Sequence, residues 1–215
     1  MKAILTKKII SCIAISGVLS FSACEIMAAN QQTINDGKNH SKILNENHEN
    51  LTDSQIFKIL STANNGEIKQ AKTALPKLKM DEAKKYAEMM IKEHSANEKN
   101  AQALASRLQL ISQTSNLSKS LQNDSDKIVS KLNQITSDTD KNYMMSQVKV
   151  HRKVLTIIDK QLIPNTKSSE LKNMLIQTRD AVAKHLKAAE DIFKKYEIIY
   201  NYYLLKIHLK KPSIN

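Results

Sequence analysis

The sequence predicts an all-α protein, an up-down four-helix bundle with a short extra helix before the third bundle helix. Composition is the first reason: three Gly, three Pro and no Trp in 215 residues do not suit sandwiches or barrels, which need frequent turns and aromatic-rich strands. Periodicity is the second, because apolar residues recur every three or four positions, as on the core face of a helix. A chain of this length fits one domain with a sizeable core.

Capping residues and prolines predict where the first two helices begin and end. The first helix should begin at Thr52, whose side chain caps it while Gln55 reaches back, and it should break at Pro76. Gly66 inside it predicts a slight bend or a close contact with another helix. The second helix should start at Asp81, a good N-cap, and end around residue 110.

The second half of the chain should hold one short and two long helices. In order, we expect a polar stretch to about residue 123, the short amphipathic helix around 128–135, and the third bundle helix at 139–162. Pro164 should end that helix. Ser168 or Ser169 should cap the fourth, with Glu170 in its first turn.

Residues 1–24 are predicted to be a signal peptide outside the fold. Lysines precede an apolar run at 9–21 that has secretory length and is too short for a stable membrane anchor. The segment FSAC at 21–24 resembles a lipobox, in which Cys24 would carry a lipid and attach the protein to a membrane. The alternative is ordinary signal cleavage near Ala28 or Ala29.

The remaining boundaries follow from composition. Residues 25–51 are rich in Asn, His, Lys and Gln and predict a flexible linker, 52–195 the bundle, and 196–215 a Tyr-rich C-terminal tail. Cys12 and Cys24 both lie in or at the end of the leader, so the predicted folded part has no disulfide and no thiolate metal site.

Charge limits the partners that we expect. The net charge of +12 falls to +9 without residues 1–24, and the basic residues are spread over all helices instead of forming one stripe. With export predicted, we expect no nucleic-acid partner and a protein of the periplasm or outer membrane. A weak attraction to anionic envelope lipid or polysaccharide is the alternative to a simply solvated surface.

Four titratable residues fall in the apolar seams of the four predicted bundle helices, one in each. They are Glu67, His94, His151 and His185. Ionisable groups in a core are costly unless they are paired, hydrogen-bonded or bound to metal. At about 1.5 Å per residue, their distances from the helix ends place them within about one turn of a common level.

One carboxylate and three imidazoles suit a Zn, Mn or Fe ion, which would load better near neutral pH than in acid. The alternative is a metal-free polar layer that fixes the register of the bundle, in which the histidines bond one another, Glu67, Gln70, Asn97 or Thr178. A di-iron carboxylate centre is excluded, because it needs Glu three positions before a ligating His, and Ile91, Val148 and Val182 stand there. No sequence motif for c-type haem, phosphate loops or nucleophilic catalysis is present.

Four segments together resemble the ferritin-like family called domain of unknown function 4142. They are ANNGEI, YAEMMIKEHSANEKNAQALA, DTDKNYMMSQVKVHRKVL and LKNMLIQTRDAVAKHLKAAEDI, within residues 52–192. The matching positions are Glu67, Met90, Glu93, His94, Tyr143, His151, His185 and Leu186. The resemblance implies a four-helix bundle in the bacterial envelope, most members being exported, and it implies no established activity. The tail beyond Ile192 departs from the family pattern.

Three functions are therefore compatible with the sequence. The leading interpretation is a non-enzymatic exported bundle that binds a partner or responds to envelope stress and holds one metal ion in the layer of Glu67 and the three histidines. The second is a small metalloenzyme for peroxide or oxygen chemistry, which needs an open coordination position. The third is a purely structural lipoprotein. The sequence identifies no ligand and no envelope partner.

Overall fold

The computed structural model describes residues 50–209, and within this range every regular element is helical. Five long helices follow one another: α2 (Asp53–Ala74), α3 (Asp81–Arg107), α4 (Asn116–Gln134), α5 (Thr139–Ile157) and α7 (Ser169–Leu209). Short turns join some of them: η1 (Leu75–Lys77), the π-helical η2 (Ile158–Leu162) and α6 (Ile163–Asn165). The predicted leader at 1–24 with Cys24, and nearly all of the linker at 25–51, lie outside the described residues.

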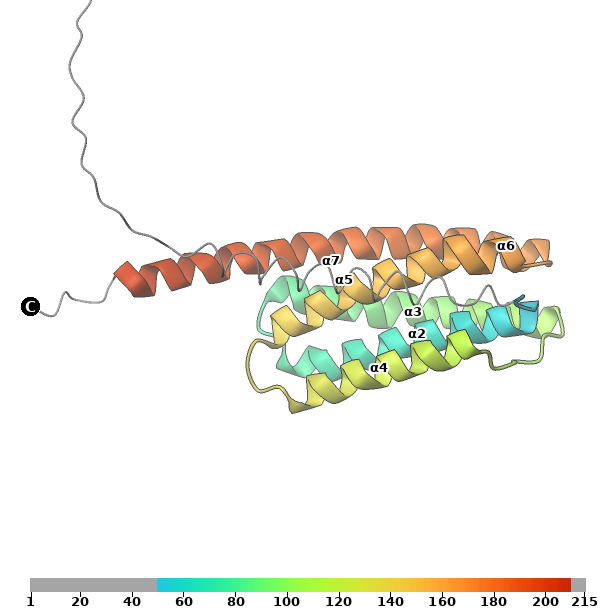
Figure 1. The fold of residues 1–215 in the computed structure, drawn as a ribbon, viewed down its shortest axis with the longest axis horizontal. Coiled ribbons are helices and arrows are strands. Elements are labelled where there is room, and N and C mark those ends of the chain that lie inside the picture. The colour runs from blue at the N-terminus through green and yellow to red at the C-terminus, as the bar shows by residue number, and fades with distance from the viewer. Residues whose placement is uncertain (1–49, 210–215) are drawn as a thin grey trace, which may run out of the picture. The chain divides into compact units, whose positions relative to one another are not determined.

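The helices pack side by side (Figure 1). α2 lies against both α3 and α4, while α5 lies against α7, and α3 closes the arrangement by contacting α7. Figure 1 also shows α7 continuing past the ends of the other helices. None of the described helices is both apolar enough and long enough to cross a membrane.

Two large apolar clusters fill the opposite ends of this assembly, and a small third cluster, which includes Phe57 and Ala105, adjoins the first. The first gathers residues near the beginning of α2 and α7, near the end of α3 and α5, and in η2. They include Ile56, Leu104, Ile158 and Leu175. The second gathers residues from the other ends of those helices, including Ala74, Met90, Met144 and Ala189. Successive helices therefore run in opposite directions, and the polar layer predicted from the seams lies between the two large clusters.

Several predicted helix ends are confirmed. Thr52 and Gln55 form the capping box at the start of α2, and Pro76 lies in the turn that ends it. Ser168 accepts a hydrogen bond from the amide of Leu171 at the start of α7. The close contact expected at Gly66 is present: a Cβ there would lie 3.0 Å from the hydroxyl oxygen of Ser125 on α4.

The predicted extra helix is wrong in length. α4 has 19 residues and begins at Asn116, inside the stretch expected to be polar and irregular. Ser115 caps it through a reciprocal pair of hydrogen bonds with Ser118, and one face buries Leu121, Val129 and Leu132. The stretch was missed because its apolar residues are few and its serines and asparagines have low helix propensity, which packing against α2 overrides.

Two other ends differ in detail. The N-cap of α3 is Met80 and not the predicted Asp81, and no side chain caps this helix locally. The backbone amide of Met80 donates a hydrogen bond to the carboxylate of Asp140. The third bundle helix does not stop before Pro164, because the chain passes through the π-helical turn and stays helical to Asn165. Proline has no amide hydrogen to donate within a helix. The π-turn changes the local hydrogen-bond pattern, and the helix can therefore continue through Pro164.

Candidate metal centre

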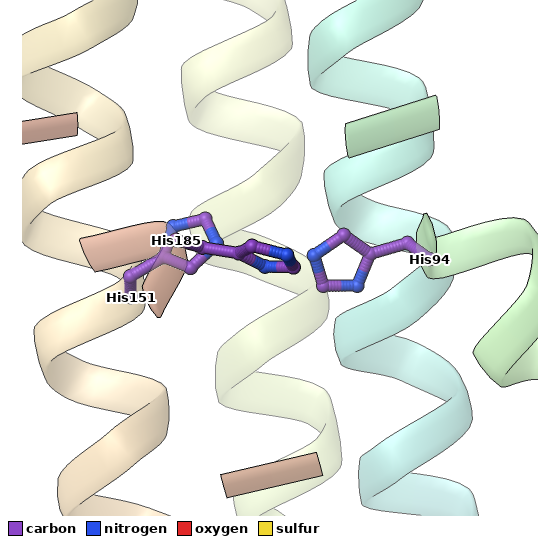
Figure 2. Close-up of side chains that lie close together, drawn as sticks. All are labelled: His94, His151 and His185. Carbon is purple, nitrogen blue, oxygen red and sulfur yellow. The ribbon is translucent and has the colours of Figure 1, made fainter. Parts of the chain in front are cut away.

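Three of the four seam residues meet in the core. His94 of α3, His151 of α5 and His185 of α7 are 5%, 2% and 4% exposed, and one ring nitrogen of each lies within 4.8 Å of the others. The ring centroids are 5.3 to 5.9 Å apart. Figure 2 shows the three rings pointing toward one another from separate helices. The periodicity in the sequence therefore placed these histidines correctly on the core face of each helix.

Each histidine has one ring nitrogen fixed by an acceptor. His94 Nδ1 lies 3.0 Å from the amide oxygen of Asn64. His151 Nδ1 lies 2.9 Å from the backbone carbonyl oxygen of Gln147, and His185 Nε2 lies 2.8 Å from a carboxylate oxygen of Glu93. A carbonyl, an amide oxygen and an ionised carboxylate can only accept, so each of these nitrogens carries the proton. The tautomer of all three rings follows from that.

The second nitrogen of each ring is left as an unprotonated acceptor. His94 Nε2, His151 Nε2 and His185 Nδ1 are buried, and none has a hydrogen-bond partner. A buried acceptor without a partner costs about 1–3 kcal/mol. Metal-ligating histidines have this same arrangement, in which the outer N–H donates to a carboxylate or carbonyl and the inner nitrogen faces the ion. The three rings therefore form a donor set that can hold a metal.

The spacing is slightly wider than a loaded site requires. An ion at the centre of three nitrogens no more than 4.8 Å apart would lie at most about 2.8 Å from each, compared with about 2.0–2.1 Å for a zinc–nitrogen bond. Inward movement of each ring by about 0.7 Å would close this gap, which is within the range of small side-chain torsions.

Burial keeps two of the three histidines, His94 and His151, in the neutral form that can bind metal. Desolvation, and after it the neighbouring His185, lower the pKa of His151 to about 3. Desolvation and the two other histidines also hold the pKa of His94 well below its ordinary value. At neutral pH both rings present lone pairs to the centre of the layer instead of competing protons.

Glu67 of α2 is in the core but does not belong to the group of three. It is 3% exposed, and neither carboxylate oxygen has a hydrogen-bond partner. Desolvation raises its pKa to about 8. Desolvation, and after it the nearby Glu67 carboxylate, raise the pKa of the buried phenols Tyr86 and Tyr143. The prediction that Glu67 ligates the metal stays a prediction, and the ligand atoms brought together are those of the histidines.

A cleft between α3 and α7 reaches the histidines from one side. It has a volume of about 290 Å³, and its lining includes His94 and His185 but not His151. Asn97, Asn100, Gln177 and Thr178 supply amide and hydroxyl groups along its walls. Glu93, whose side chain is 49% exposed, also lines it, so the carboxylate that orients His185 is reached from the surface.

Comparison with protein families identifies the chain. The protein-family model described as "Domain of unknown function (DUF4142)" matches residues 39–192, which is more than half of the sequence. The chain belongs to this family. The match includes α2 to α5 and the first half of α7, and thus all residues of the candidate metal centre. Searches of curated proteins and of solved structures each found no match.

Sequence reasoning missed the residues that orient the rings. From the sequence, Glu93 is only a position of the family pattern next to His94, and no orienting role is predicted for it. Asn64 lies one turn before Glu67 on the same face of α2, and it was not singled out. The metal-free alternative predicts that the histidines bond one another, Glu67, Gln70, Asn97 or Thr178. The partners in the structure are Asn64, Gln147 and Glu93, and Asn97 donates to the Asn64 oxygen that contacts His94.

Proposed function

We propose that this protein is an exported, ferritin-like four-helix-bundle protein of the bacterial envelope that holds one transition-metal ion between His94, His151 and His185. In this proposal it is a non-enzymatic binding module. The observation that carries the proposal is the set of three buried ring nitrogens without partners, each in a tautomer fixed by an outer acceptor. A metal-free layer would leave all three acceptors unsatisfied at the same place, which is costly.

Zinc is the ion that best suits this donor set. Three neutral imidazoles with a free fourth position are a known zinc arrangement, and imidazole also suits iron. Manganese prefers oxygen ligands, so it would require Glu67 to turn into the site. The identity of the ion therefore tests whether Glu67 joins the three histidines.

Elemental analysis tests the proposal. Protein refolded with Zn, Mn or Fe and then desalted should retain about one ion per chain, and its melting temperature should rise. His151→Ala should abolish retention, whereas His48→Gln, which changes a histidine of the predicted linker, should not. If no metal is retained and the melting temperature stays the same with all three ions, the metal part of the proposal is wrong.

The cellular location is tested separately. The basic and apolar leader supports export, and the FSAC segment supports a lipid on Cys24. Fractionation should find the mature protein in the membrane fraction, and Cys24→Ser should release it. A Cys24→Ser variant with unchanged size and solubility would argue for ordinary signal cleavage.

The cleft favours a second candidate function, a small metalloenzyme acting on peroxide or oxygen. Such an enzyme needs a route from solvent to the ion, and the cleft between α3 and α7 has His94 and His185 in its lining. In this case His151→Ala should abolish turnover while circular dichroism still reports a folded protein. Loss of folding, with no turnover by the unmodified protein, would exclude the enzyme.

A further inference from the structure

The spaces on the two sides of the metal site differ in kind. On the α2 side, Glu67 is enclosed and lines a space of about 30 Å³, which is the size of a single water molecule. On the α3–α7 side, the cleft of about 290 Å³ has the volume of roughly nine or ten water molecules. Only the larger of these two spaces has room for a molecule larger than water. On the α3–α7 side a further space of about 580 Å³, also lined by Glu93 and His185, adjoins the cleft.

The walls of the cleft indicate which molecules fit. The lining contains amide and hydroxyl side chains, small apolar residues such as Ala96 and Ala181, and one carboxylate, Glu93, but no lysine or arginine. Its volume is at the lower end of the range for ligand pockets. An ion with three neutral ligands keeps its full double positive charge and attracts oxygen or nitrogen donors. The class that fits is a small neutral or singly charged donor.

The cleft is also connected to the ligand geometry. The hydroxyl of Thr178 lies 3.4 Å from the amide oxygen of Asn97. The amide nitrogen of Asn97 donates a hydrogen bond to the side-chain oxygen of Asn64, and this same oxygen accepts the hydrogen bond from His94. A wall of the cleft therefore helps to fix the ring that faces the metal. This arrangement holds His94 in place while the space beside it stays available.

We propose that the cleft between α3 and α7 brings a small exogenous oxygen- or nitrogen-donor molecule to the fourth coordination position of the ion held by His94, His151 and His185. The inference rests on the proposed metal site. It names the side from which the ion is reached and the class of molecule that reaches it. Under this proposal Glu67 does not occupy the fourth position when the exogenous ligand is bound.

Cobalt(II) with azide as the ligand provides the test, because the visible spectrum of cobalt reports its coordination. Full-length protein loaded with cobalt should show the intense bands of a four-coordinate ion, and added azide should shift them in a saturable way. Ala96→Trp and Ala181→Trp, which fill the cleft from opposite walls, should weaken azide binding at least tenfold. Each variant should keep the cobalt spectrum measured without azide.

Ala103→Trp is the matched control. Ala103 is exposed on α3 two turns beyond Ala96, outside the lining of the cleft, so this variant should bind azide like the unmodified protein. Ala96 is itself exposed, so a tryptophan there should be tolerated even if Ala181→Trp fails to fold. Circular dichroism verifies folding for all three variants.

The outcomes separate the two proposals. If cobalt does not bind, the metal site itself is wrong, and this inference falls with it. If cobalt binds and azide changes nothing, the metal site stands and the fourth position is closed, which overturns the inference. Equal azide affinity in the two cleft variants and in the control would also overturn it, because the ligand would then enter elsewhere.

Discussion

The apolar ends of the core and its polar middle solve different problems. Each apolar cluster is complete in itself, with large side chains such as Ile158 and Leu175 fully buried against one another. In the middle, every buried side-chain N or O atom without a hydrogen-bond partner in the described residues belongs to one small set, namely Glu67, His94, Tyr143, Gln147, His151 and His185. The ends account for the fold, and the middle layer gathers the buried polar atoms that have no partner.

Because of this contrast, substitutions in the two regions should have different effects on folding stability and on metal binding. Hydrophobic burial does not depend on a ligand, so changes in the apolar ends should alter stability with and without metal. Changes in the middle layer should act mainly through metal binding, since binding to the folded state alone adds stability by mass action.

The largest effect should come from an apolar end. Leu175→Ala empties a fully buried position and should lower the free energy of unfolding by about 2–5 kcal/mol, through lost burial and the cavity left behind. The loss should be equal in zinc and in chelator, as measured by urea denaturation. Leu175→Met keeps the volume and should cost less than about 1.5 kcal/mol. A loss seen only in zinc would break the distinction between the two regions.

The next effect should come from removing a metal ligand. Zinc at a thousand times its dissociation constant should stabilise the unmodified protein by about 4 kcal/mol, and His151→Leu should abolish this gain. Without metal, His151→Leu should be no less stable than the unmodified protein, because leucine removes a buried acceptor that has no partner. The measurement is thermal unfolding with and without zinc.

Ser125→Ala provides the control for that comparison. Ser125 is buried on α4, outside the group of three histidines, and accepts a hydrogen bond from Gln70. Its loss should lower stability modestly and leave the zinc-dependent gain intact. A large loss of stability in metal-free His151→Leu would instead favour a structural polar layer.

A pH-dependent effect is expected at Glu67. Its pKa rises from 4.5 to about 8 on folding, so the folded state binds a proton more tightly than the unfolded chain. The stability of the metal-free protein that comes from this group is therefore fully present below pH 4.5 and is lost as the pH rises toward 8. Glu67→Gln should remove this loss, so the variant should gain stability over the unmodified protein at pH 9 and not at pH 4.

Urea denaturation in chelator across this pH range measures the difference. Glu88→Gln, at an exposed position of α3, controls for the change in net charge and should give a curve parallel to that of the unmodified protein. Parallel curves for Glu67→Gln as well would show that the Glu67 carboxylate finds a partner in solution.

The smallest effect concerns the helix that the sequence did not predict at full length. Ser115→Ala removes the cap of α4 and should cost about 1 kcal/mol, with no effect on metal retention. Ser130→Ala, at an exposed position inside α4, should cost nothing, because alanine is the better helix former. Equal effects of both substitutions would contradict the capping box.

Much of the fold was predictable because it depends on local rules. Caps such as Thr52, breaks such as Pro76 and the spacing of apolar residues act within one or two turns, and they located the helices and their core faces. α4 was underestimated because its stability comes from packing against α2, and the close approach of Gly66 to Ser125 is visible only once both helices are placed.

By itself the sequence determined that one histidine lies on the core face in each of three helices, because a period of 3.6 residues fixes direction around a helix axis. The tertiary structure alone decided which side chains meet. It brought the three rings together, left Glu67 outside their group, and placed Asn64 and Glu93 behind the rings as acceptors. The reason is that axial rotation and stagger of one helix against another depend on the whole packed core, and a shift of a few ångströms decides whether a side chain contacts its neighbour.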